Sequence, residues 1–283
     1  MFNGDMKKEA IEALKVTQAE HEAHAKAVGE ASVKLYELRK AGSEQIISAA
    51  EAYVNELANS PKEFDKTFTE FRAEYKKFNE IVVSIEQEAA KVNAQAGTGA
   101  AAGVAAGVGV AAFAPTAAMA IATTFGTAST GTAISVLSGA AATNAALAWL
   151  GGGALAVGGG GMVAGEAFLA LAGPVGWAIG GTALVAAGLF TRSRNRKIAE
   201  DAQEETKKIE THIAALTAAK LEVKRLYGLT ERHIDGVNTL LDQLRERAPR
   251  NYLAFSTVEK EWLGALINHV HSLSELLNKK VDA

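Results

Sequence analysis

The histidines and the glycine-rich stretches are the residues of this sequence whose types could carry chemistry. His21 and His24 stand three apart in "HEAH", whereas a zinc-binding helix places its two histidines four apart. The stretches "GTGAAAG" and "GGGALAVGGGG" lack the lysine and the hydroxyl residue of a phosphate-binding loop and follow no predicted strand. The other histidines are scattered, and His269 and His271 stand two apart, so their side chains should point in different directions.

No nucleophile, general base and orienting group occur together in the sequence. We therefore predict that the chain is not an enzyme and has neither a cofactor nor a metal site. The absence of cysteine excludes disulfides, zinc–thiolate sites and thiol catalysis. A net charge of −3 gives no reason to expect nucleic acid as a partner. The charged N-terminus "MFNGDMKKEAIEALK" lacks the apolar core of a signal peptide, which favours a cytoplasmic protein and leaves secretion by another route open.

Charge is partitioned sharply along the 283 residues. Between residues 97 and 191 the only ionisable side chain is Glu166, and 21 of the 27 glycines fall in this stretch. Both flanks are dense in Lys, Arg, Glu and Asp. We therefore predict three parts: an N-terminal helical arm (1–95), a hydrophobic Gly/Ala-rich hairpin region (96–191) and a C-terminal helical arm (192–283).

The central region contains pieces long enough to span about 30 Å of hydrocarbon, at residues 100–122, 127–150 and 154–190. They are rich in Ala, Gly, Val and Thr, and each Gly costs about 1 kcal/mol relative to Ala inside a helix. Glycines four apart would let helix backbones approach closely in a membrane or a tight bundle. The residues that we expect to enter a membrane are Gly103, Gly107, Trp149, Gly151, Gly158, Trp177 and Gly180.

Other readings of the central region stay open at this point. It could be a permanent membrane anchor or the buried core of a bundle that never meets lipid. Glu166 could lie in a polar turn at the hairpin tip or face a water-filled lumen. Trp149 and Trp177 could sit at the membrane interface or fill a core.

Four cations follow the central region directly. Arg192, Arg194, Arg196 and Lys197 come immediately after an apolar segment, a pattern typical of contact with anionic lipid headgroups. The alternative is the solvated start of a charged helix.

The two arms read as long amphipathic helices and predict an all-α fold, an elongated helical bundle or coiled coil. The clearest stripe follows Pro61 and keeps a heptad spacing for about four heptads. Its members are Phe64, Phe68, Phe71, Tyr75, Phe78, Val82, Ile85, Ala89 and Val92. So many aromatic residues suit a bundle of three or more helices better than a two-stranded coil. Helix breaks are expected at Gly42-Ser43, Gly228 and Ala248-Pro249. If the helices before and after the central region pair antiparallel, the central region forms a hairpin at one end of an elongated bundle.

Residues 130–165, "TGTAISVLSGAAATNAALAWLGGGALAVGGGGMVAG", resemble a segment of uncharacterised bacterial helical proteins with a Gly/Ala-rich hairpin between coiled-coil arms. The layout of the whole chain is similar to α-helical pore-forming toxins of the cytolysin A and haemolysin BL type, and to apolipoprotein L. The resemblance implies a bundle that shields a hydrophobic hairpin until the hairpin enters lipid. It supplies no catalytic residues.

Together these observations predict a protein that is first soluble and then inserts into a membrane, as an oligomer, and permeabilises it. The expected partners are a lipid membrane, further copies of the chain and, as an open alternative, a partner subunit. A bacterial toxin and an intracellular defence effector both fit. The competing hypothesis is a hairpin-anchored coiled-coil scaffold that organises partners at a membrane without opening it.

Overall fold

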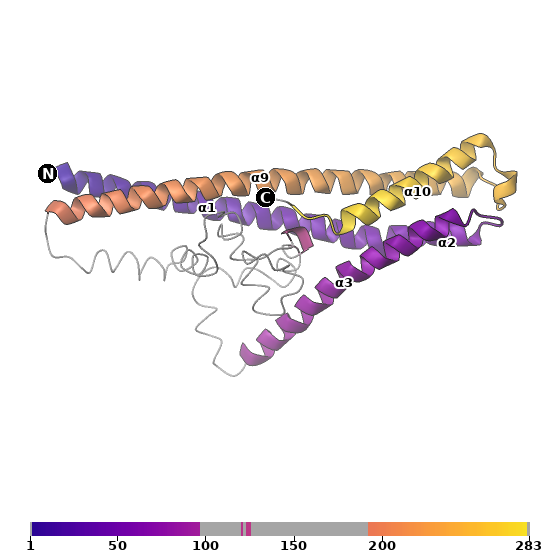
Figure 1. Ribbon diagram of the computed structural model, residues 1–283, viewed down its shortest axis with the longest axis horizontal. Coiled ribbons are helices and arrows are strands. Elements are labelled where there is room, and N and C mark those ends of the chain that lie inside the picture. Colours follow the sequence, from indigo (N-terminus) through magenta and orange to yellow (C-terminus); the bar gives the residue numbers. More distant parts are fainter. Residues whose placement is uncertain (1, 97–119, 121–122, 126–191, 282–283) are drawn as a thin grey trace.

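The computed structural model describes residues 2–96, 120, 123–125 and 192–281 of the chain. Every element in this part is a helix, so the prediction of an all-α fold is confirmed for it (Figure 1). In chain order the elements are α1 (Phe2–Ala41), the π-helical η1 (Gly42–Ile47), α2 (Ser48–Glu56), α3 (Glu63–Ala96), α9 (Arg192–Arg247), the 3-10 helix η4 (Tyr252–Ala254) and α10 (Thr257–Leu277).

The first half of the described chain is a helical hairpin. α1, η1 and α2 follow one another as a continuous run, which ends where Leu57 adopts an extended conformation. The turn over residues 57–62 contains Asn59, the only non-glycine residue with a positive φ (58°) in the described backbone. α3 then returns antiparallel to the run, and the Tyr75 hydroxyl donates to the Glu44 carboxylate across the hairpin at 3.3 Å. Asparagine is one of the few residues that tolerate this conformation, which permits the sharp reversal.

The second half is another helical hairpin, formed by α9 and α10. α9 ends at Arg247, immediately before Ala248-Pro249, so the break predicted there is confirmed. α10 begins with a capping box in which the Glu259 amide donates to the Ser256 hydroxyl and the Ser256 amide donates to the Glu259 carboxylate. Such a reciprocal pair satisfies two backbone donors that the first turn of a helix leaves free.

The two hairpins lie side by side with their turns at the same end of the molecule, on the right in Figure 1. The Ala58 amide donates to the Arg250 carbonyl at 3.0 Å, and the Tyr252 amide donates to the Ala58 carbonyl at 2.9 Å. The side chains of Asn59 and Asn251 are hydrogen-bonded as well, at 2.9 Å. These bonds join the two turns and fix the hairpins to each other.

This arrangement makes α1 and α9 parallel neighbours. Residues near the start of each helix pack together, as Ala10 does with Ala199, and residues further along also meet, as Gly42 does with Ile234. The helices on either side of the centre, α3 and α9, run in opposite directions (Figure 1). α3 packs mainly against α10, whereas α9 packs mainly against α1 and α10. The antiparallel direction considered for these two helices is therefore present, but their direct pairing is not a main contact of the bundle.

The largest apolar core lies toward the end with the turns, where both hairpins contribute. Phe68, Phe71, Phe78 and Val82 of the predicted stripe are buried, and the Phe78 ring stacks on Tyr36 with centroids 5.8 Å apart. The stripe therefore belongs to a bundle of more than two helices, as its aromatic residues indicated. The side chains of Ile85, Ala89 and Val92 lie outside the described residues.

One of the expected helix breaks is wrong, and the one at Gly42-Ser43 is a change of helix type at the end of α1. α9 runs unbroken through Gly228, because the cost of one glycine is small beside the burial of Leu226 and Thr230 on either side. The helical run also continues through Gly42 as η1. A Cβ atom at Gly42 would lie 2.7 Å from the Ile234 side chain, so this glycine serves the close approach of α9 rather than a break.

Candidate functional site

The residues predicted to enter a membrane lie outside the described residues, and so does Glu166. The four cations Arg192, Arg194, Arg196 and Lys197 lie within the described residues, in the first two turns of α9. Arg196 is exposed and its Nε donates to Glu200 at 2.8 Å, and Lys197 is exposed as well. The side chains of Arg192 and Arg194 are not described. Among the described residues, no helix is both long enough and apolar enough to span a bilayer.

The described residues of the central region, Ala120 and 123–125, are packed against the arms. Phe125 is 2% exposed and lies in a core cluster with side chains of α1 and α9 and with Val281. The Val281 amide donates to the Thr124 carbonyl at 2.8 Å. We call this contact the docking site; its members are Ala120, Thr123, Thr124, Phe125, Arg39, Lys280 and Val281. It joins the central region to α1 and to the segment that follows α10.

Two cationic side chains hold the docking site together. Arg39, 2% exposed, donates from Nη2 to the Lys279 carbonyl at 2.7 Å and from Nη1 to the Thr123 carbonyl at 3.4 Å. Lys280 donates to the same Thr123 carbonyl at 2.8 Å. Burial lowers the pKa of Arg39 to about 9; burial and the nearby Arg39 lower the pKa of Lys280 to about 8. In this site one buried and one half-buried cationic side chain donate hydrogen bonds to backbone carbonyls.

Sequence reasoning did not single out Arg39 or Lys280. A signal for Arg39 was present, because it continues the spacing of Val28, Ser32 and Leu35 and therefore lies on the buried face of α1. A long charged side chain at such a position is seldom buried without hydrogen-bond partners. Lys280 carries no comparable signal, because it follows the end of α10 and no helical period reaches it.

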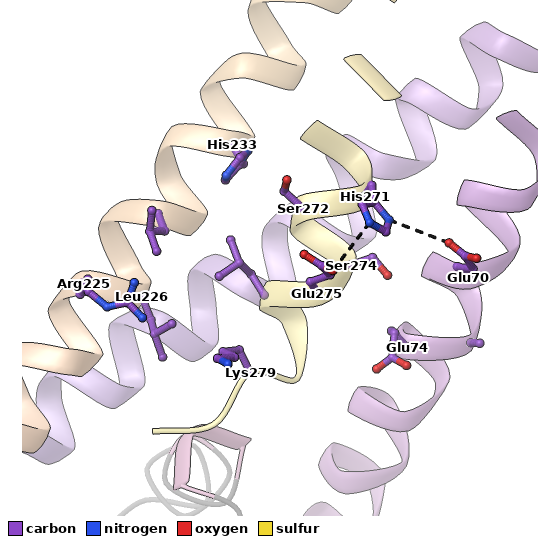
Figure 2. Close-up of a pocket in the computed structure, with 13 residues that line it drawn as sticks. Glu70, Glu74, Arg225, Leu226, His233, His271, Ser272, Ser274, Glu275 and Lys279 are labelled. Atoms are coloured by element: carbon purple, nitrogen blue, oxygen red, sulfur yellow. Dashed lines mark ion pairs between the residues drawn. The ribbon is translucent and has the colours of Figure 1, made fainter. Parts of the chain in front are cut away.

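An open cleft of about 800 Å³ lies between α3, α9 and α10 (Figure 2). His271 projects into it from α10, with Nδ1 3.9 Å from Glu70 of α3 and Nε2 3.7 Å from Glu275. His233 and Arg225 of α9 line the opposite wall. Within the described chain no three His, Asp or Glu side chains are arranged to hold a metal ion.

Four of the other histidines meet in two pairs across helix contacts, which the sequence did not reveal, whereas His24 bonds Thr217. His233 of α9 and His269 of α10 place their Nδ1 atoms 2.8 Å apart. His21 of α1 and His212 of α9 have ring centroids 6.3 Å apart. His269 and His271 face different helices, as their spacing indicated. Pairing depends on the register between helices, and no single stripe contains that information.

Comparisons with known proteins add no function to this geometry. No family model, curated protein or solved structure matches the chain.

Proposed function

We propose that this chain is a membrane-permeabilising protein, whose helical arms carry the apolar central region and release it into a lipid bilayer. The observation that carries the proposal is the docking site. A region with one ionisable side chain in 95 positions (97–191) meets the arms through a buried Phe125 and a clamp of hydrogen bonds. A contact of this kind can shelter apolar residues before insertion.

The direction of the helices supports the same proposal. The turns of both hairpins lie at one end, whereas α9 begins at the opposite end and α3 runs away from the turns (Figure 1). The central region therefore leaves and rejoins the arms on the side remote from the turns. Both arms would then stay on the same side of a membrane, which requires an even number of crossings.

The cations at the start of α9 fit this orientation. Arg196 and Lys197 are exposed on the first turns after the central region, where an inserted hairpin would meet lipid headgroups. Insertion as an oligomer would give the small-residue faces of the central region partners in neighbouring copies.

Carboxyfluorescein release from vesicles containing anionic lipid tests the proposal. The chain has no cysteine, so a disulfide can be introduced between T124C and V281C, whose backbone N and O atoms are hydrogen-bonded at 2.8 Å. We expect release by the parent protein, no release by the oxidised variant, and release again after reduction. The matched control joins A58C to R250C at the turns, where a disulfide should leave release unchanged.

Release that persists with the docking disulfide confirmed would overturn the proposal. Vesicle binding without release by the parent would favour the scaffold hypothesis. Absence of any vesicle association would mean that the central region serves as a core.

A further inference from the structure

All six histidines of the chain lie in the described helices. α10 carries two of them, and the chemical setting of these two is opposite. His269 meets another histidine on α9, whereas His271 meets carboxylates on α3 and on its own helix. A positive charge on His269 and one on His271 therefore have opposite consequences for the two helix contacts of α10.

The contact of α10 with α9 contains a hydrogen bond between His233 and His269 that needs at least one of the two rings to be neutral. The two Nδ1 atoms are 2.8 Å apart, so one ring donates a hydrogen bond and the other accepts it. When both rings are protonated both nitrogens become donors, the hydrogen bond is lost, and two positive charges face each other. Gly236 confines the pair, since a Cβ atom there would lie 2.5 Å from the His269 ring.

The charged groups around this pair do not neutralise the positive charge that a second proton would add. Arg232 lies beside His233 on α9, and the α1 side chain Arg39 borders a small cavity with Thr230 and Ile234. Arg225 and Lys279 line the cleft next to His233. The carboxylates of the cleft have other partners: Glu70 and Glu275 flank His271, and Glu74 bonds Lys77 and Asn278.

The contact of α10 with α3 changes in the other direction. His271 lies between Glu70 and Glu275, at nitrogen–oxygen distances of 3.9 and 3.7 Å (Figure 2). A protonated His271 forms an ion pair with each carboxylate, and the pair with Glu70 joins two helices. Glu74 of α3 adds a second link in any protonation state of the histidines, because Asn278 donates to its carbonyl and its carboxylate.

We propose that α10 is an acid-responsive element that loses its contact with α9 at His233–His269 while it keeps and strengthens its contact with α3 at His271–Glu70. The contact of α1 with α9 responds in the same direction as the α9–α10 contact. There His21 faces His212 and His24, and Glu205 is the nearby carboxylate. Acid thus loosens α9 from both of its neighbours and leaves α10 with the first hairpin.

The test measures distances between spin labels in lipid-free protein, so that its outcome does not depend on the proposed membrane function. The chain has no cysteine, and Asn238 of α9, Asn268 of α10 and Lys66 of α3 are exposed positions for labels. Between pH 7.5 and pH 5.0 we expect the 238–268 distance to lengthen by more than about 5 Å in a large fraction of molecules, beyond the reach of side-chain repacking at a contact. The 66–268 distance should stay unchanged.

Two variants assign the change to the histidines. H269Q keeps a hydrogen-bonding side chain that cannot be protonated, and it should abolish the acid change in the 238–268 distance. H271Q should keep that change and broaden the 66–268 distance as well. H233Q provides a second test of the pair if H269Q does not reach the parent helix content by circular dichroism at pH 7.5. A 238–268 distance that is the same at both pH values, or an acid change that persists in a folded H269Q or H233Q variant, overturns the proposal.

Discussion

At the scale of single residues, glycine has two different roles in these helices. Gly236 faces the His269 ring, whereas no atom of another element lies within 4 Å of a Cβ atom placed at Gly228. The same substitution should therefore have opposite effects at the two positions. Sequence alone does not distinguish them, because both glycines interrupt α9 in the same way.

We expect G236A to lower the free energy of unfolding by about 1–3 kcal/mol, because an imidazole ring packed between helices has little room to move. G228A should raise it by up to about 1 kcal/mol, since alanine favours the helix and meets no obstacle. Urea unfolding followed by circular dichroism measures both. Equal effects of the two variants would mean that His269 does not confine Gly236.

His21 should make the protein less stable in acid. Burial, His212 and His24 lower its pKa from 6.5 to about 4. At a pH between these two values His21 is protonated in the unfolded chain and neutral in the folded chain. Its contribution to stability is complete above pH 6.5 and is lost progressively as the pH falls toward 4, by up to about 3 kcal/mol. H21Q should flatten this part of the profile of unfolding free energy against pH.

The half-buried His24 provides the control for His21, because it bonds Thr217 near the surface. H24Q should leave most of the pH dependence in place. A profile that H21Q does not change would show that the acid sensitivity of the bundle arises elsewhere.

At the scale of elements, the stripes predicted from the sequence are the buried faces of the helices. The heptad after Pro61 identified the described core side chains of α3 except Ile81, because burial follows the period of a helix whatever its partner is. The partner itself was not predictable. Phe78 packs on Tyr36 from α1, and the stripe would look the same if it packed on α9. The docking site was missed for the same reason, since Arg39 meets residues 84 and 240 positions away.

The aromatic stripe should be the main stabilising feature of α3. We expect F78A to lower the free energy of unfolding by about 3–5 kcal/mol, because the ring is 1% exposed and stacked on Tyr36. V83A on the same helix is the control, since Val83 is 38% exposed and should change stability by less than about 0.5 kcal/mol. If F78A and the parent protein had the same free energy of unfolding, the stripe would lie on the surface of the bundle.

At the scale of the whole molecule, the docking site ties the central region to both hairpins. Residues 97–191 contain no lysine or arginine, so trypsin cannot report on them, whereas elastase cuts after small apolar residues. Removal of the Phe125 ring should weaken docking by about 3–5 kcal/mol without a change in the helix contacts of the arms. Cleavage of an opened segment follows the population of the open form.

We therefore expect F125A to accelerate elastase cleavage within residues 97–191 by at least about tenfold, with an unchanged melt of the arms. L253A is the control, because Leu253 is 73% exposed at the turn of the second hairpin. Rapid cleavage of the parent protein, or equal rates for the parent and F125A, would mean that this contact does not shelter the central region.

The parallel pairing of α1 with α9 also sets an order of events during synthesis. His24 and Thr217, which meet across this pair, are 193 residues apart in the chain. At about 5–20 residues per second, a ribosome needs roughly 10–40 s to pass from one to the other. The first hairpin can close on its own in that interval, whereas the buried face of α1 has no partner while the apolar central region emerges. A nascent chain is therefore exposed to aggregation, or to early contact with a membrane, until α9 has been made.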